Sequence, residues 1–181
     1  MVGKRRSIVK RESIIGLPVF DGKNGEKLGV VKDLYFNGQS NRLEGLYVTN
    51  RDMGRNFIEI PFIDASLGYD AVIAEGKVFP HNADRAEDEI TEKLLYKRVV
   101  REDGTELGMI SDIIFDPLTG RIQGLELSEG IIGDLISGRQ ILPFELSESI
   151  NGDTLIISME QAQNITPINR GIKNILFNKL E

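Results

Sequence analysis

The chain has 181 residues, a net charge of −6 and no cysteine. The length allows one medium domain or two small ones. The absence of cysteine excludes disulfides, thiolate metal sites and cysteine nucleophiles, and it fits a reducing, cytoplasmic location. No apolar run approaches the roughly 20 residues that a membrane-spanning helix needs. The acidic balance argues against a general nucleic-acid binder, although it allows a local basic patch.

The first twelve residues form a basic arm, with five cations and one anion. The apolar stretch after the first three cations is short and is broken by further charges, so we do not expect a secretory signal peptide. One interpretation is a solvated arm. The alternative is an electrostatic contact with RNA or another anionic surface. The cations of the basic arm are Lys4, Arg5, Arg6, Lys10 and Arg11.

An internal repeat follows the arm. When the sequence is shifted by 79 residues, eight identities fall within the 22 positions from 25 to 46 without a gap. A three-residue insertion in the second copy then brings Pro61 and Phe62 onto Pro143 and Phe144. Such self-similarity indicates a duplicated structural unit. The identities pair Gly25, Leu28, Gly29, Asp33, Phe36, Arg42, Gly45 and Leu46 with Gly104, Leu107, Gly108, Asp112, Phe115, Arg121, Gly124 and Leu125.

Each copy contains five short stretches with strand character, separated by close turns. Equivalent Asn-Gly and Asp-Gly dipeptides, at Gly25 and Gly104, favour tight hairpin turns. Too few residues separate the stretches for crossover helices, so each copy would form a small antiparallel barrel or a strongly bent sheet, and we predict an all-β fold of two tandem, small antiparallel β-barrels. The predicted strands are 18–21, 28–36, 43–48, 57–60 and 71–74 in the first copy, and 98–101, 107–115, 122–127, 140–142 and 154–158 in the second.

Glycine and aspartate stand inside the longest predicted strand of each copy, where both residue types are disfavoured. We expect Gly29 and Gly108 to mark a sharp bend or a close approach of another chain segment. We expect Asp33 and Asp112 to have a structural role, accepting hydrogen bonds from the backbone or from an arginine of the adjoining strand. The arginines in question are Arg42 and Arg121.

The repeated motif resembles that of the PRC-barrel family. It reads NGEKLGVVKDLYFNGQSNRLEGLYV in the first copy and DGTELGMISDIIFDPLTGRIQGLEL in the second, and the resemblance covers roughly residues 8–79 and 92–160. The family is named for the cytoplasmic domain of the photosynthetic reaction-centre H subunit, and it includes the C-terminal domain of the ribosome-maturation factor RimM. The resemblance implies a small β-barrel that binds other macromolecules and has no shared catalytic residues.

Residues 80–94 join the two copies, and their pattern predicts a short helical linker. Asp84 and Glu87 have the spacing of a capping box, and Ala86, Ile90 and Leu94 recur at helical spacing. We therefore place a first domain at 8–79, the linker at 80–94, a second domain at 95–160 and a C-terminal segment at 161–181. Within the last segment, residues 169–180 have the pattern of a short amphipathic helix.

The insertion of the second copy lies in residues 129–140 and concentrates apolar side chains between two glycines. These side chains would form either a lid over the end of the second barrel or an exposed docking site for a protein partner. The apolar residues of this insertion loop are Ile131, Ile132, Leu135 and Ile136.

No catalytic constellation stands out in the sequence. The single histidine, His81, excludes a three-histidine metal site, and the glycines are spaced for turns rather than for a phosphate-binding loop. We expect a non-enzymatic binding or adaptor protein, without cofactor or metal, that contacts another protein through its barrel surfaces. The alternative is an RNA- or ribosome-associated factor that uses the basic arm. The pattern neither requires nor opposes self-association.

Overall fold

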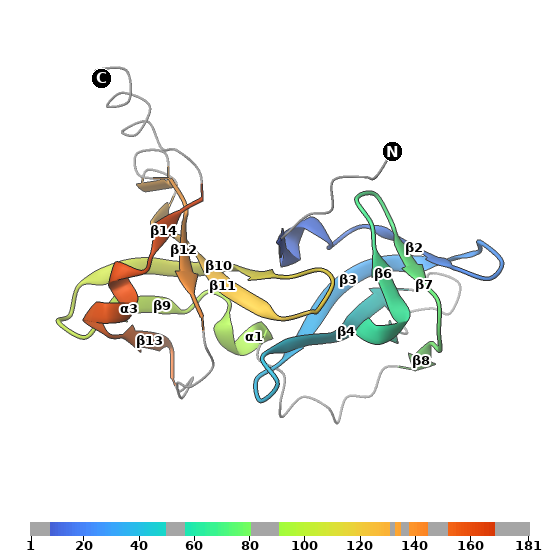
Figure 1. Cartoon of the computed structure of the whole chain (residues 1–181), viewed down its shortest axis with the longest axis horizontal. Coiled ribbons are helices and arrows are strands. Elements are labelled where there is room, and N and C mark those ends of the chain that lie inside the picture. The colour runs from blue at the N-terminus through green and yellow to red at the C-terminus, as the bar shows by residue number, and fades with distance from the viewer. Residues whose placement is uncertain are drawn as a thin grey trace, which may run out of the picture. The chain divides into compact units, whose positions relative to one another are not determined.

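The computed structural model of the chain describes residues 8–49, 57–80, 91–130, 133–134, 138–144 and 152–168. Contacts divide the chain into two compact units, which are shown with their strands labelled in Figure 1. One unit consists of Met1–Thr91 with Phe115–Ile122, and the other of Glu92–Ile114 with Gln123–Glu181. The units therefore do not coincide with the two sequence repeats, because a segment of the second repeat belongs to the first unit.

The first unit contains a sheet with the strand order β6-β7-β2-β3-β4-β5-β8. Neighbouring strands are antiparallel, except that β2 and β7 run parallel. The strands are β2 (Pro18–Asp21), β3 (Lys27–Asn37), β4 (Arg42–Thr49), β5 (Phe57–Pro61), β6 (Ala65–Leu67), β7 (Val72–Ala74) and β8 (Phe79–Pro80). The short strand β1 (Val9–Lys10) and the 3-10 helix η1 (Arg11–Ser13) precede them, and η2 (Phe62–Asp64) connects β5 to β6.

The second unit repeats this arrangement, with the strand order β13-β9-β10-β11-β12-β14. Its strands are β9 (Arg98–Arg101), β10 (Glu106–Phe115), β11 (Ile122–Ser128), β12 (Gln140–Pro143), β13 (Thr154–Ile157) and β14 (Thr166–Pro167). β13 runs parallel to β9, just as β7 runs parallel to β2. The helix α3 (Met159–Gln163) begins at a capping box formed by Ser158 and Gln161. All ten strands predicted from the sequence are present, with ends that agree within one residue.

The predicted architecture is confirmed in part. The described residues are mostly β and form two sheets, one of them curled into a half-barrel, but the prediction that all strands are antiparallel is wrong. Each sheet contains one parallel pair. In the first sheet β7 lies beside β2 and runs in the same direction, and in the second sheet β13 lies beside β9 in the same way. No helical linker is seen: the only helix described near residues 80–94 is the single turn α1 (Thr91–Leu94). The positions that suggested the linker helix, residues 84–90, lie outside the described residues.

Gly29 and Gly108 lie where strand backbones approach each other closely, as the sequence predicted. A Cβ atom at Gly29 would lie 2.0 Å from the carbonyl oxygen of Thr49, and one at Gly108 would lie 2.7 Å from that of Ser128. Thr49 and Ser128 occupy equivalent positions in β4 and β11. The residue before each glycine is the extra residue of a β-bulge in the pairing with the preceding strand. Both copies therefore keep the same crossing and the same bulge.

The segment Phe115–Ile122 of the second repeat supplies part of the core of the first unit. Phe115 is fully buried and packs edge-on against the fully buried Phe36, with 5.4 Å between the ring centroids. Thr91, also in the first unit, is buried beside this pair. Its hydroxyl donates to the carbonyl oxygen of Leu34 at 3.1 Å and accepts from the N–H of Phe36 at 3.3 Å.

Two backbone hydrogen bonds attach the same segment to the turn between β3 and β4. The N–H of Leu43 donates to the carbonyl oxygen of Gly120 at 2.8 Å, and the N–H of Ile122 donates to that of Asn41 at 3.1 Å. Leu43 and Ile122 are equivalent positions in the two repeats, and so are Asn41 and Gly120. The two hydrogen bonds are therefore reciprocal: each repeat donates from one position and accepts at another, and these positions are equivalent in the two repeats.

Replacing Gly29 by alanine is expected to lower the free energy of unfolding by about 2–3 kcal/mol, because the added methyl group would meet a strand backbone that cannot move aside. Gly25→Ala is the matched control in the same unit. Gly25 has a φ of +73° but no atom within 4 Å of an added Cβ, so only the backbone cost of about 1 kcal/mol applies. Urea unfolding of the full chain measures both changes. Equal losses for the two variants would contradict the explanation from close approach.

Candidate functional site

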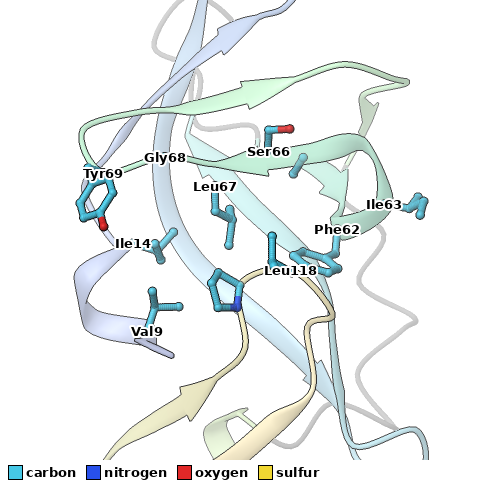
Figure 2. Close-up of a pocket in the computed structure, with 11 residues that line it drawn as sticks. Val9, Ile14, Phe62, Ile63, Ser66, Leu67, Gly68, Tyr69 and Leu118 are labelled. Carbon is cyan, nitrogen blue, oxygen red and sulfur yellow. The ribbon is translucent and has the colours of Figure 1, made fainter. Parts of the chain in front are cut away.

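An apolar groove of about 410 Å³ lies in the first unit (Figure 2). Three segments form it: the chain around β1 and η1, the segment from η2 through β6 into the turn before β7, and the loop of the second repeat that belongs to this unit. The groove is lined by Val9, Ile14, Phe62, Ile63, Ala65, Ser66, Leu67, Gly68, Tyr69, Pro117 and Leu118. Residues far apart in the sequence are thus brought to one surface.

The groove has a buried floor and an exposed rim. Val9 and Ile14 are buried, whereas Leu118 is 64% exposed and Tyr69 is 54% exposed. Figure 2 shows the side chain of Leu118 rising toward that of Leu67 on β6. Ile63 lies at the periphery and is 91% exposed. Exposed aliphatic and aromatic side chains around an apolar floor are typical of surfaces that receive a partner.

The lining offers little polar chemistry. Ser66 and Tyr69 carry its side-chain hydroxyl groups, and the hydroxyl of Ser66 donates to the carboxylate of Glu75 at 3.2 Å. No carboxylate, amine or imidazole belongs to the described lining residues. The groove can therefore bury an apolar side chain.

The second repeat provides an internal comparison for the exposed residues of the groove. Leu118 corresponds to Gln39, which is also exposed in its turn. Ile63 corresponds to Glu145, and Tyr69 corresponds to Gly152. At the position of Leu118 the repeated fold therefore accepts the polar, exposed Gln39, so folding alone does not explain that exposed apolar side chain.

A separate polar network in the second unit holds the base of the insertion loop. Glu126 in β11 is fully buried, and Nη1 of Arg139 donates to its Oε1. Nε of Arg139 also donates to Oδ2 of Asp134 at 3.2 Å. Asp134 in turn accepts hydrogen bonds from the hydroxyl of Ser128 at 2.7 Å and from the N–H of Glu129 at 2.9 Å. The hydrogen bond to Glu126 is the main cause that raises the pKa of Arg139.

Sequence reasoning missed this network. Glu126 stands between Leu125 and Leu127 in a predicted strand, and this alternation predicts a solvated side chain, so the sequence contains no signal of its burial. The equivalent residue of the first repeat is Tyr47, so the network belongs to the second copy alone. The four apolar residues predicted to dock a partner, Ile131, Ile132, Leu135 and Ile136, lie outside the described residues.

The basic arm is described only in part. Lys4, Arg5 and Arg6 lie outside the described residues, whereas Lys10 belongs to β1 and Arg11 opens η1. The guanidinium of Arg11 donates two hydrogen bonds of 2.7 Å to the carboxylate of Asp33, in a largely buried position. At least this cation of the predicted arm has a structural role.

The aspartates within the long strands accept backbone hydrogen bonds. Asp33 accepts from the N–H of Leu34 at 2.6 Å, and the buried Asp112 accepts from that of Ile113 at 2.8 Å. The prediction that Arg42 pairs with Asp33 was wrong, because Asp33 is paired with Arg11. Arg42 and Arg121 are exposed, and their backbones face each other in an antiparallel bridge. The adjoining strand turns these arginine side chains toward solvent, out of reach of the aspartate.

Gly45 and Gly124, the remaining repeat positions, lie within β4 and β11 and are closely packed. A Cβ at Gly45 would lie 2.4 Å from the hydroxyl oxygen of Tyr35, and one at Gly124 would lie 2.8 Å from the carbonyl oxygen of Leu142. Both glycines therefore serve packing inside the sheets.

Within the part of the chain that the structure describes, no group of three or more His, Asp or Glu side chains is placed to hold a metal ion. His81 lies outside that part. No described helix is long and apolar enough to cross a membrane.

These features define a tandem repeat of one small β domain that carries an exposed apolar groove. The profile of the PRC-barrel domain matches residues 8–78 and again residues 88–160. The chain belongs to the PRC-barrel family, with two copies of the domain in tandem. No match to the chain was found among curated proteins.

Replacing Arg139 by methionine is expected to lower the free energy of unfolding by about 3 kcal/mol, because the buried carboxylate of Glu126 would lose its cation. Urea unfolding of the full chain measures the loss. Arg101→Met is the matched control, because Arg101 pairs with Asp103 at the surface, where neither side chain is buried, and its loss should change stability little. Similar small losses for both variants would show that the network does not stabilise the second unit.

Proposed function

We propose that this PRC-barrel protein is a non-enzymatic, cytoplasmic adaptor that binds another protein through the apolar groove of its first unit. One observation carries the proposal: Leu118, Ile63 and Tyr69 are each more than half exposed around this groove, whereas the other copy of the fold has polar or small residues there. Burying one such side chain against a partner contributes about 1.5–3 kcal/mol. Three of them can anchor a protein complex.

The character of the groove favours a protein partner over RNA. RNA binding depends on cations that neutralise phosphates, and no lysine or arginine belongs to the described lining residues. Arg11, which lies nearest in sequence to the lining residue Val9 among the arginines of the arm, is engaged by Asp33. The RNA- or ribosome-binding alternative rests on the other cations of the arm, Lys4, Arg5, Arg6 and Lys10, and it becomes one outcome of the test.

The test is affinity capture of the tagged full chain from its native lysate, with and without nuclease, read by mass spectrometry. Leu118→Gln and Ile63→Glu introduce the residues that the other repeat has at these positions, so neither should disturb folding. We expect protein partners that survive nuclease and that the double variant captures at least about tenfold less, a loss of about 1.4 kcal/mol or more.

Ile156→Thr is the matched control, since Ile156 on β13 is 65% exposed but does not line the groove. This variant should capture the partners as the unmodified chain does. Partners that disappear with nuclease would establish the RNA alternative. Partners that the double variant retains in full would show that the groove is not the binding surface.

A further inference from the structure

The groove runs along an open strand edge. β6 is the terminal strand of its sheet, and among the described residues it pairs with β7 alone. Ser66 and Leu67 of β6 both belong to the lining, and Figure 2 shows this strand bordering the groove along its length. A strand edge beside an apolar groove is a template for pairing with another extended segment.

The pairing with β7 determines which backbone groups of β6 face away from the sheet. The N–H of Gly68 donates to the carbonyl oxygen of Ala71 at 2.9 Å, and the N–H of Glu75 donates to that of Asp64 at 2.8 Å. Hydrogen-bonded positions alternate along an antiparallel pair. Residues 64, 66 and 68 therefore bond toward β7, and residues 65 and 67 direct their backbone groups outward.

On this outer edge, Leu67 offers both an N–H and a carbonyl oxygen. No hydrogen bond joins either group to another described backbone group. The N–H of Ala65 is already used, because it donates to the carbonyl oxygen of Phe62 at the end of η2. An added strand would therefore exchange a pair of hydrogen bonds with Leu67, and its side chains would alternate between the groove and solvent.

Acidic residues adjoin the lining of the groove in the sequence. Glu75 is hydrogen-bonded to Ser66, and three aspartates are each next in sequence to a lining residue. Lys10 is next in sequence to the lining residue Val9, and the following residue, Arg11, is paired with Asp33. Acidic surroundings favour a partner that carries lysine or arginine beside its apolar side chain. The three aspartates are Asp64, Asp70 and Asp116.

From the open edge, the apolar floor and the acidic surroundings, and resting on the proposed function, we infer the form of the partner. It presents an extended segment that adds as a strand to β6, pairs with Leu67, inserts a branched aliphatic side chain into the groove, and carries lysine or arginine at the alternate positions that face solvent.

The direct test uses the purified full chain and two synthetic probes, an acetylated and amidated pentapeptide of alternating lysine and valine and its counterpart with glutamate in place of lysine. Amide hydrogen exchange is followed by NMR. We expect the lysine peptide to slow exchange at the N–H of Leu67 at least about tenfold, while the N–H of Ser66, already bonded within the sheet, changes little. The glutamate peptide should give no protection. No protection by either peptide, or equal protection by both, would overturn the inference.

A pair of variants at one position gives a second test. Leu67→Pro removes the outward N–H, and proline is tolerated on an edge strand, whereas Leu67→Val keeps the N–H and an aliphatic side chain. We expect the proline variant to bind the lysine peptide at least about tenfold more weakly and the valine variant to bind within about threefold of the unmodified chain. Equal binding by both variants would overturn strand addition.

The outcomes separate this inference from the proposed function. If Leu118→Gln with Ile63→Glu abolishes capture of the native partner but Leu67 gains no protection from that partner, the groove binds a protein in another manner and only strand addition is wrong. If the double variant captures the partner in full, the proposed function itself is wrong.

Discussion

The close crossing of strand backbones at Gly29 and Gly108 is the constraint on which the rest of each sheet depends. A side chain at either position would overlap a carbonyl oxygen of the neighbouring strand. Because neither glycine has one, the long strand of each copy can pair with its preceding strand through a bulge and continue along the next strand. The curl of the sheet follows from this local geometry, since bulges and glycines are where strands bend. Both repeats retain it although most of their other residues differ.

The curl of the first sheet leaves a core that the first repeat does not fill alone. Phe115, from the second repeat, completes it by packing on Phe36. The same segment then brings Pro117 and Leu118 to the surface beside β6. One stretch of chain therefore contributes both to the core of the first unit and to its binding groove. Because the groove needs a segment from each repeat, it can be present in the first unit without an equivalent groove in the second.

Local signals in the sequence were sufficient to predict ten of the strands, because turn dipeptides and short apolar stretches depend on neighbouring residues only. The short strands β1, β6, β8 and β14 were not predicted. The burial of Val31, Leu34, Tyr35 and Phe36 in β3 does not follow a strict alternation, and an extra residue after Val31 shifts the register of β3 against β4. The parallel pairing of β7 with β2, and of β13 with β9, depends on contacts between residues distant in the sequence. Turn and strand patterns do not predict such contacts.

The candidate site was much less predictable. The groove joins residues near positions 9–14, 62–69 and 117–118, and no single segment among them has an unusual pattern. The buried pair of Glu126 and Arg139 likewise joins separate elements. A signal for the groove was nonetheless present in the difference between the repeats. Leu118 and Ile63 are apolar, whereas their equivalents in the other repeat are Gln39 and Glu145. This difference marks positions that the fold does not require to be apolar.

The reciprocal hydrogen bonds between the turn at Asn41 and the segment at Gly120 bear on the history of the gene. A descendant that lost its second repeat would leave the N–H of Leu43 and the carbonyl oxygen of Asn41 without their partners, and Phe36 uncovered. A second molecule of the shortened chain could satisfy the same groups, because the contact is symmetric in equivalent residues. Deletion of one repeat would therefore yield a homodimer or an unstable chain, and selection would keep the duplication once it had been fixed.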